Sequence, residues 1–583
     1  MFASFRLSMA WLHTWFGLVL GFVLMAVFFF GSLSVYDREI DRWAIPSTRF
    51  EPQPMPSFDK LLEPAFRRIV PNQAALDEAR GRSNSPLPAV MPLHEWGAYT
   101  THRDPVLTVW SGFELPDPKD PDNDHVYGIA TLDPRTGQAL PDDRLKLGSQ
   151  FFYPMHYSLH LHWKELGTWI VGLAALVMLA ALVSGVVMHR KIFRELFTFR
   201  PRKHTQRSAL DLHNLTGVVA LPFHFMFALS GLVIFAAMYF PVGETMLPPL
   251  AKAHEHAESL RTGLPHEAAG VPAGLASVDA MVAEAQRRWA ARGMAGDVGM
   301  LTVHHVGDAN ATVSVFRAGT DRVTLTGEGI HFKGPTGEVI REDEPVNMVD
   351  GINNFITGLH LQHFRHWLLR VLYFAGGLAG CACIATGFIF FVEKRKKQHA
   401  AKGQAGSRVV DALAVTTVTG MLIATATMLV ANRLLPEALP MRGVWEERIF
   451  WAAWLLAFGH AWWRTAPELQ ARVAPAWAEQ CWAVAVLAVA AVLLNALTTG
   501  DHLLKTLADG YWPVAGVDLV LLGAAALALV AARRVRQRAR GNVVDGTGTP
   551  AGRDTGRFAS SHAAASAPAQ PGRAPQMPEA GHA

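Results

Sequence analysis

Charged residues are scarce in this sequence of 583 amino acids. Only 17% of the residues are Asp, Glu, Lys or Arg, whereas 50% are hydrophobic and fall largely into long runs. A helix needs about 20 apolar residues to cross a bilayer core about 30 Å thick. The composition therefore argues against a soluble protein of this size and predicts an integral membrane protein in contact with lipid.

Several chemical signatures are also missing. The only cysteines are Cys381, Cys383 and Cys481, all within apolar segments, so the long polar stretches cannot form a disulfide. Cys381 and Cys383 are better interpreted as small residues that ease helix packing than as a metal site. The chain contains no CxxCH motif for covalent haem attachment and no dinucleotide fingerprint, Walker loop or nucleic-acid-binding motif. The modest net charge of +4 gives no reason to expect a nucleic-acid partner.

Eight apolar segments are long enough to cross a membrane. The first is longer than a typical signal-peptide core, and no A-x-A-like site follows it, so we expect an uncleaved anchor. The fold class predicted is an all-α transmembrane bundle of about eight helices. The segments are 9–36, 166–189, 212–240, 366–392, 409–431, 446–463, 477–498 and 514–532.

Basic residues beside these segments predict the orientation. Clusters follow the second, fourth and eighth segments, and cytoplasmic flanks are rich in Lys and Arg. Both termini are therefore expected in the cytoplasm, although Arg433, Arg442 and Arg448 run mildly against this. The clusters comprise Arg190, Lys191, Arg194, Arg200, Arg202, Lys203 and Arg207, then Lys394, Arg395, Lys396, Lys397 and Lys402, then Arg533, Arg534, Arg536, Arg538 and Arg540.

The expected layout alternates membrane helices with polar segments. The two long polar segments should lie outside the cytoplasm, and the Gly-, Pro-, Ala- and Ser-rich end should be disordered. The predicted units are 1–36 (first helix), 37–160 (outer domain 1), 161–189 (second helix), 190–211 (basic loop), 212–240 (third helix), 241–358 (outer domain 2), 359–392 (fourth helix), 393–408 (basic loop), 409–540 (four further helices) and 541–583 (tail).

An internal repeat with an offset of 200 residues organises residues 9–398. Leu12-His13 and Gly17 match Leu212-His213 and Gly217, and Leu159-His160-Leu161 matches Leu359-His360-Leu361. The outer segments match as well, at 129–138 and 330–338, and each match predicts a strand, a Thr-Gly turn and a return strand. Each repeat should therefore comprise a helix, a small α+β domain and a second helix, so that the two repeats are parallel.

Further elements are predicted in the second outer segment. The spacing of apolar residues predicts an amphipathic helix over Val278–Ala291. Residues 312–316 and 322–326 are typical of strands.

Four histidines at matched repeat positions are the strongest candidates for chemistry. Ionisable residues in membrane helices are costly and generally functional. His13 and His213 should lie near the cytoplasmic face, and His160 and His360 near the outer face. Two imidazoles facing each other across a bundle can hold haem iron. The pattern predicts two b-type haems, with the iron bound by His13 and His213 and by His160 and His360.

Other histidines compete for these roles. His224 lies eleven residues after His213 and on the same helix face, so it could replace an outer ligand. His156 precedes His160 by one helical turn and rivals it, and His189 could ligate or lie at the interface. Among external histidines, solvated surface positions are the simpler interpretation for the His254-x-His256 and His304-His305 pairs.

These motifs resemble those of the PepSY-associated transmembrane helix proteins. The similarity covers residues 9–398 and is carried by 155–161, 185–202, 211–217, 221–224 and 358–363. The resemblance implies PepSY-type outer domains, a bacterial-type inner membrane and a haem-bearing reductase of ferric siderophores linked to iron uptake. A separate donor, quinol or a flavoprotein, would be needed. The alternatives are a membrane-anchored binding or regulatory protein and a transporter that uses the last four helices.

Overall fold

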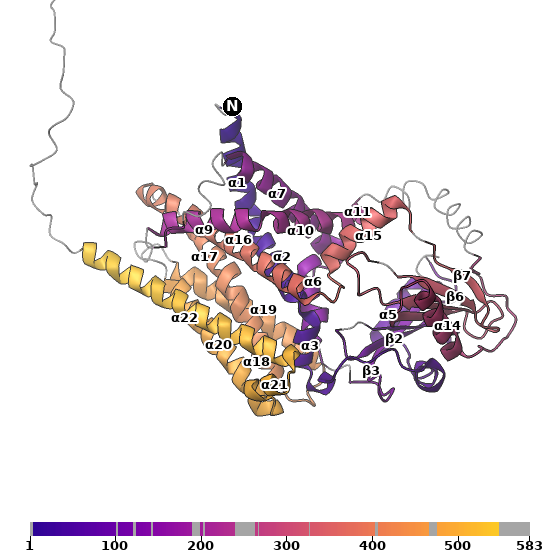
Figure 1. The fold of residues 1–583 in the computed structure, drawn as a ribbon. Helices are drawn as coiled ribbons and strands as arrows, with labels where there is room; N and C mark the ends of the chain where they lie inside the picture. Colours follow the sequence, from indigo (N-terminus) through magenta and orange to yellow (C-terminus); the bar gives the residue numbers. More distant parts are fainter. Residues whose placement is uncertain are drawn as a thin grey trace, which may run out of the picture.

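The computed structural model is mostly helical, with one antiparallel sheet at one end (Figure 1). It describes residues 4–100, 103–119, 124–141, 144–188, 199–201, 204–239, 263–265, 267–325, 327–344, 346–402, 406–465 and 475–546. The predictions made for His189, Arg190, Lys191, Arg194, Arg202, Lys203, His254, His256 and the tail from 547 onward lie outside these residues.

Five helical stretches are long and apolar enough to cross a membrane, and two bent helix pairs qualify if each counts as one span. The described chain therefore has five to seven candidate spans where eight were predicted. The single stretches are Trp163–Met188 (mainly α7, Leu166–Met188), Trp367–Arg395 (in α16, Trp367–Ala401), Arg408–Leu434 (α17, Gly406–Val415, through α18, Met421–Leu434), Pro475–Thr499 (α20) and Trp512–Gln537 (in α22, Trp512–Gly546).

The predicted sixth segment and the predicted boundaries need correction. Residues 446–463 do form a helix (α19, Arg442–Arg464), but Glu446, Glu447 and Arg448 in its first turns shorten its apolar stretch. Helix α16 continues beyond 392 into the basic loop predicted at 393–408, and α22 continues to Gly546. Residues 541–546, predicted to be disordered, are therefore helical.

The first and third predicted spans are both broken near their middle. Helices α1 (Phe5–Val19) and α2 (Gly21–Ser34) bend by 62°, and α9 (Thr205–Val219) and α10 (Leu221–Ile234) bend by 65°. The breaks fall at Leu20 and Ala220, whose backbone angles are nearly equal. Pro222 at the start of α10 lacks an amide hydrogen, which explains the second break. Leu20 and Ala220 are 200 residues apart, so the repeat includes the position and the backbone conformation of the bend.

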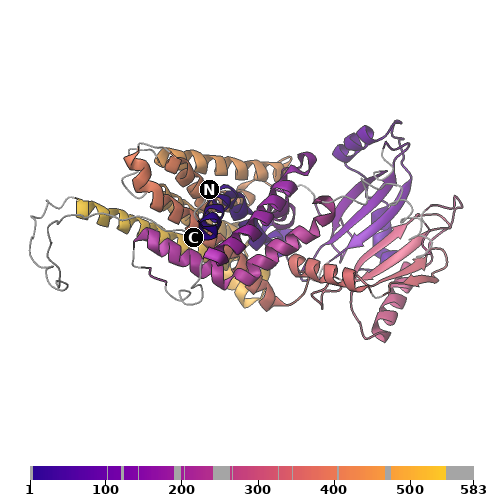
Figure 2. The same ribbon diagram turned by 90° about the horizontal axis from the view of Figure 1, so that it is seen from above.

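The strands of the two predicted outer domains form one seven-stranded antiparallel sheet (Figure 2). Its order is β3-β2-β1-β4-β5-β6-β7, so β1 of the first segment pairs directly with β4 of the second. A three-stranded meander and a four-stranded meander thus share one hydrogen-bonded seam instead of forming two separate sheets. The strands are β1 (Leu93–Tyr99), β2 (Leu107–Glu114), β3 (His125–Leu132), β4 (Val298–His304), β5 (Thr312–Arg317), β6 (Gly329–Lys333) and β7 (Val339–Glu342).

Reciprocal hydrogen bonds also join the two halves. The Ser57 hydroxyl and the Phe58 amide donate to the carboxylate of Asp279, at 2.5 and 2.7 Å. The Ser277 hydroxyl and the Val278 amide donate to Asp59, at 2.6 and 3.0 Å. Each carboxylate therefore caps the helix of the opposite half. Both halves also supply one hydrophobic core that includes Phe58, Trp96, Trp289 and Val313.

Local predictions for this sheet are mostly confirmed. The amphipathic helix occupies Val278–Ala291 (α14), and a strand covers 312–316. Gly137 and Gly337 adopt positive φ at matched turns, as the Thr-Gly motif predicted. The strand predicted at 322–326 is wrong. There the Leu325 amide donates to the Asn354 carbonyl of α15 (Met348–Leu361), and β5 pairs instead with Gly329–Lys333.

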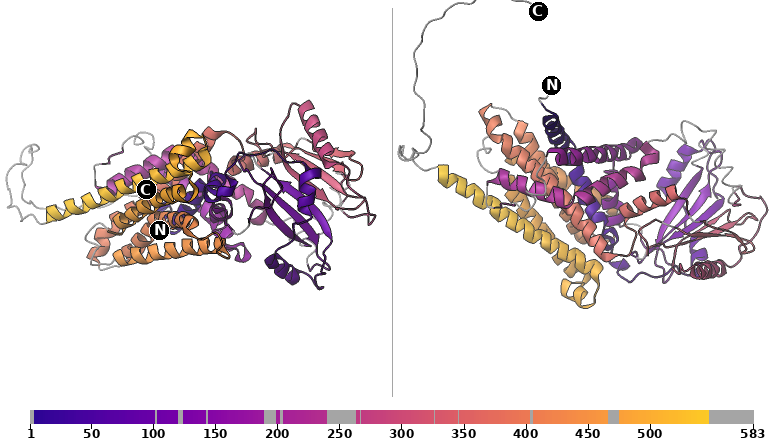
Figure 3. Two further views of the ribbon diagram at one scale, coloured as in Figure 1. Left: turned by 90° about the horizontal axis from the view of Figure 1, so that it is seen from below. Right: turned by 45° about the horizontal axis from the view of Figure 1, so that its top comes forward.

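The last helices pack against one side of the repeat through α3 (Asp37–Ala44), as Figure 3 shows. The Trp43 indole donates to Asp518 at 2.8 Å, and Arg49, which follows α3, donates to Asn495 and Asp501 at 2.8 and 2.7 Å. The Arg433 guanidinium donates to the Trp43 carbonyl at 3.0 Å. This hydrogen bond gives Arg433 a structural role, which explains why it lies on the side where few basic residues were expected.

Candidate functional site

His13 on α1 and His213 on α9 face each other across the helix bundle. Their ring centroids are 6.0 Å apart, and the ring planes are nearly perpendicular, at 83°. Nδ1 of His13 lies 2.9 Å from the Ala181 carbonyl oxygen of α7, and Nδ1 of His213 lies 2.7 Å from the Cys383 carbonyl oxygen of α16. Each ring thus contacts a carbonyl oxygen of a neighbouring helix through Nδ1. We call these two residues the far pair, because they are the pair farther from the sheet.

His156 and His360 form a second pair, nearer the sheet. His156 lies on α6 (Tyr153–Tyr157) and His360 on α15, with centroids 5.9 Å apart and planes inclined by only 25°. Nδ1 of His156 lies 2.8 Å from the Val27 carbonyl oxygen, and Nδ1 of His360 lies 2.8 Å from the Ser230 hydroxyl. We call these residues the sheet-side pair.

The Nδ1 contacts determine where the lone pair of each ring lies. A carbonyl oxygen can only accept, so three of the four rings must donate through Nδ1–H. The Ser230 hydroxyl already donates to the Met226 carbonyl at 2.5 Å and therefore accepts from His360 as well. In each ring the lone pair is then on Nε2. Histidines that bind metals typically donate their other ring nitrogen to such a partner.

The ring spacings match the binding of one metal between two imidazoles. A metal–nitrogen bond of about 2 Å puts the metal roughly 3 Å from the ring centroid. Two rings on opposite sides of one metal then have centroids roughly 6 Å apart. The observed 6.0 and 5.9 Å both agree with this value.

A glycine of a neighbouring helix lies beside each of the four rings. A Cβ added to any of these glycines would come within 3.3 Å of the imidazole, and at Gly31 it would reach 2.6 Å from Nδ1 of His156. Only a residue without a side chain lets the ring lie in this position. The neighbours are Gly185 for His13, Gly387 for His213, Gly31 for His156 and Gly231 for His360.

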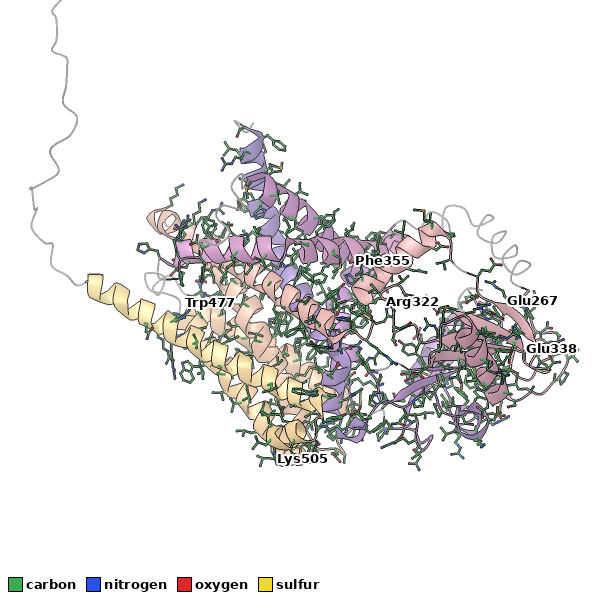
Figure 4. The ribbon with its side chains drawn as sticks, in the orientation of Figure 1. Glu267, Arg322, Glu338, Phe355, Trp477 and Lys505 are labelled. Atoms are coloured by element: carbon green, nitrogen blue, oxygen red, sulfur yellow. The ribbon has the colours of Figure 1, made fainter. Side chains whose placement is uncertain are left out.

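The sheet-side pair lines a cavity of about 610 Å³ between the membrane helices and the sheet. This size is typical of a cofactor pocket, which holds roughly 300–1,000 Å³. Tyr99 and Met300 of the sheet contribute to its wall, as do Arg38 and Arg103. In the side-chain view, Phe355 of α15 and Arg322 lie between the membrane helices and the sheet (Figure 4). The lining is largely apolar, so the cavity can hold an apolar group.

His160 and His224 do not join either pair. Nε2 of His160 donates to the Phe151 carbonyl at 3.0 Å, and the ring stacks on Phe151. Leu159 and His160 both have positive φ, and this turn separates His160 from the position predicted opposite His360. Nε2 of His224 lies 3.2 Å from the Gly376 carbonyl oxygen. Both rings donate through Nε2 to a carbonyl oxygen, so their lone pairs are on Nδ1 and neither ring lies opposite a ring of the two pairs.

A second sequence register would have identified the sheet-side pair. The pattern His-x5-His-Trp occurs at 156–163 and again at 360–367, an offset of 204 rather than 200. This register aligns His156 with His360, and it aligns Trp163 with Trp367. The two tryptophans are 72% and 71% exposed, which supports their equivalence. The two registers differ by four residues, and the structure brings together the rings aligned by the second one.

A comparison with known protein families matches the part of the chain that holds the repeat. A family model described as the PepSY-associated TM region matches residues 10–394. An uncharacterized protein of Pseudomonas aeruginosa is 26% identical over 379 residues, which cover 62% of this chain and 89% of that protein. The family match includes both histidine pairs and the whole sheet, and it ends before α17.

Proposed function

The chain belongs to the family with a PepSY-associated transmembrane region, and on that premise we propose that it is a transmembrane electron-transfer protein with two b-type haems. His13 and His213 would hold one haem, and His156 and His360 the other. A haem bound by two imidazoles supplies a one-electron redox centre. The observation that carries the proposal is the opposed pairing of four rings, each with its lone pair on Nε2.

The surrounding residues have definable roles. The carbonyls of Ala181, Cys383 and Val27 and the Ser230 hydroxyl orient the rings and keep the lone pair on Nε2. The adjacent glycines make room for the rings. Arg38 and Arg103 line the sheet-side cavity and pair with Asp104 and Asp37.

The charge distribution supports a direction of transfer. Basic residues flank the ends of α16 and α22 that point away from the sheet, and since cytoplasmic flanks are rich in Lys and Arg, we propose that those ends lie in the cytoplasm and the sheet outside it. Electrons from a quinol or a flavoprotein would then enter near the far pair and leave near the sheet-side pair. We propose a ferric siderophore-type chelate as the acceptor. One electron converts Fe(III) to Fe(II), which binds hard oxygen ligands less tightly and is released for iron uptake in a bacterial-type inner membrane.

The two alternative functions would need structural features other than opposed histidine pairs. A membrane-anchored binding or regulatory protein would not need opposed histidines. A transporter that uses α17–α22 would be expected to have broken helices there, but the two pronounced breaks fall in α1/α2 and α9/α10. The histidine pairs therefore favour electron transfer.

The absorption spectrum provides the decisive experiment. The full chain, purified in detergent from haem-replete cells, should show a Soret band and, after dithionite, the sharp α band of a b-type haem, with about two haems per chain. The His160→Ala variant is the matched control and should keep both haems. A colourless wild-type preparation would overturn the proposal and favour the binding protein.

A further inference from the structure

Helix α15 carries an apolar stripe that is open to the surroundings. Its members recur at the spacing that puts side chains on one face of a helix, whereas Asp350 and Asn353 lie on other sides. Met348 is 82% exposed, Ile352 51% and Phe355 45%. The stripe consists of Met348, Ile352, Phe355 and Leu359. A contiguous apolar surface of this kind generally marks a contact with a protein or a membrane.

The other contacts of α15 hold the stripe in its outward position. Nδ1 of His360 donates to the Ser230 hydroxyl of α10 at 2.8 Å. The Leu325 amide donates to the Asn354 carbonyl at 3.0 Å. The helix is therefore fixed to α10 and to the segment at Leu325, and its stripe cannot turn inward without breaking these hydrogen bonds.

Helix α14, a second amphipathic helix of the outer segments, provides a contrast. It has apolar residues at a similar spacing, and all of them are buried in the core of the sheet. They are Val278, Met281, Ala285 and Trp289. This chain thus covers the apolar face of α14, whereas the apolar face of α15 is open in the part of the chain that the structure describes.

The first repeat shows what kind of partner suits this surface. The offset of 204 residues aligns Phe355 with Phe151 and Leu359 with Met155. Phe151 is only 1% exposed, and its ring lies 4.8 Å from that of Phe450 in α19, centroid to centroid. A helix of the C-terminal group therefore covers, in the first repeat, the surface that is open in the second. We expect an apolar covering over α15 as well.

The position of α15 beside the membrane spans points to lipid as that covering. Only residues 362–366 separate α15 from α16, and the Ser230 contact lies near the end of α10. In Figure 1, α15 runs across the direction of α16 and α22. Trp163 and Trp367, at the starts of two spans, are exposed, as is typical of aromatic residues at the surface of a bilayer. Helix α15 therefore lies at the level where the spans leave the membrane.

We propose that the apolar stripe of α15 rests among the acyl chains of the leaflet nearer the sheet, with the helix parallel to the membrane. An interfacial helix buries its apolar face in this way, at the boundary of headgroups and acyl chains. Helix α15 contains no Lys or Arg, so its binding depends on apolar area and not on anionic headgroups. Leu229 of α10 and Leu368 of α16 are exposed as well, so the lipid around these spans extends to the stripe.

Spin labels on α15 test the proposal in lipid nanodiscs. The full chain, with its three cysteines replaced by alanine, receives one label in Ile352→Cys or in the matched control Asn353→Cys. Asn353 is adjacent and exposed but lies off the stripe. Oxygen concentrates among acyl chains, whereas a nickel chelate stays in water. The ratio of oxygen to nickel accessibility should be at least threefold higher at position 352 than at position 353, in neutral and in anionic lipid alike.

Equal ratios at the two positions, or exclusion of both reagents from position 352 by a covering protein, would overturn the proposal. The wild-type chain gives a second measurement that needs no variant. A phospholipid with a photoreactive group in its acyl chain should label α15 but not α14, whose apolar residues are buried, and absence of label from α15 would likewise contradict the membrane contact. Neither measurement uses haem, so this proposal and the proposed function can fail independently.

Discussion

The far pair and the sheet-side pair use the same local chemistry in different surroundings. His13 and His213 lie within helices at an exact offset of 200 residues. His156 and His360 lie at an offset of 204, next to the last residues of their helices, and they line a cavity that reaches the sheet. Helices preserve a repeat because their packing tolerates no insertions, whereas loops accept extra residues. The offset departs from 200 residues in the part of the molecule that lines the cavity.

The far pair and the sheet-side pair are expected near opposite faces of the membrane. Reporter fusions test this topology and should give the largest difference of all the predictions. Alkaline phosphatase fused after Gly137 or Gly337 should be active, because it folds only outside the cytoplasm, and a fusion after Lys397 should be inactive. The activities should differ nearly completely. A cytoplasmic result at Gly337 would break the parallel repeat and reverse the proposed direction of electron flow.

Histidine variants should separate the two pairs by haem content. His213→Ala should remove the far haem and His360→Ala the sheet-side haem, each about half of the total, because one imidazole holds haem poorly. The double variant His213→Ala/His360→Ala should lose both haems, whereas His13→Ala/His213→Ala should resemble either single variant, because both residues act on one group. The haem-to-protein ratio measures each outcome.

His224→Ala and His160→Ala serve as controls in the same experiment. Each should retain both haems, because the ring of His160 stacks on Phe151 and the ring of His224 lies against Phe28 instead of facing one of the paired histidines. Loss of the sheet-side haem in His160→Ala with full retention in His156→Ala would restore the pairing predicted from the 200-residue repeat.

Glycine substitution should weaken one pair selectively. In Gly31→Ala the added methyl carbon would lie 2.6 Å from Nδ1 of His156, so the ring must shift and sheet-side haem should be lost in part. Gly231→Ala should have a smaller effect, since the nearest ring atom of His360 is 3.2 Å away. Gly459→Ala, with open space around it, is the control. Equal haem loss in all three variants would show that the glycines do not position the rings.

The smallest effect on haem should come from the seam of the sheet. Asp59→Ala and Asp279→Ala each remove one reciprocal helix cap, and each should lower the free energy of unfolding of the sheet by about 1 kcal/mol. Resistance of the sheet to protease under increasing denaturant measures this, and haem content should not change. Asp77→Ala, which removes exposed contacts with Arg80 and Gln73, should behave like the wild type. If the Asp59 and Asp279 variants also lose sheet-side haem, the sheet helps to build that site.

Some elements were predictable because their signals are local. The helix at 278–291 follows from the spacing of its apolar residues, and the turns at Gly137 and Gly337 follow from a backbone that favours glycine. Long apolar runs identified the membrane helices, and the repeat drew attention to His13, His213 and His360. Each of these signals lies within a few residues or recurs at one fixed spacing.

Tertiary structure decided the rest. No property of β1 or β4 alone states that they pair, because that hydrogen-bonded seam joins segments about 200 residues apart. The choice of His156 over His160 depends on a positive-φ turn that rotates one ring away and leaves the other opposite His360. The number of spans depended on bends at Leu20 and Ala220. The sequence determined which residue types could bind a metal, and long-range packing determined which of them meet.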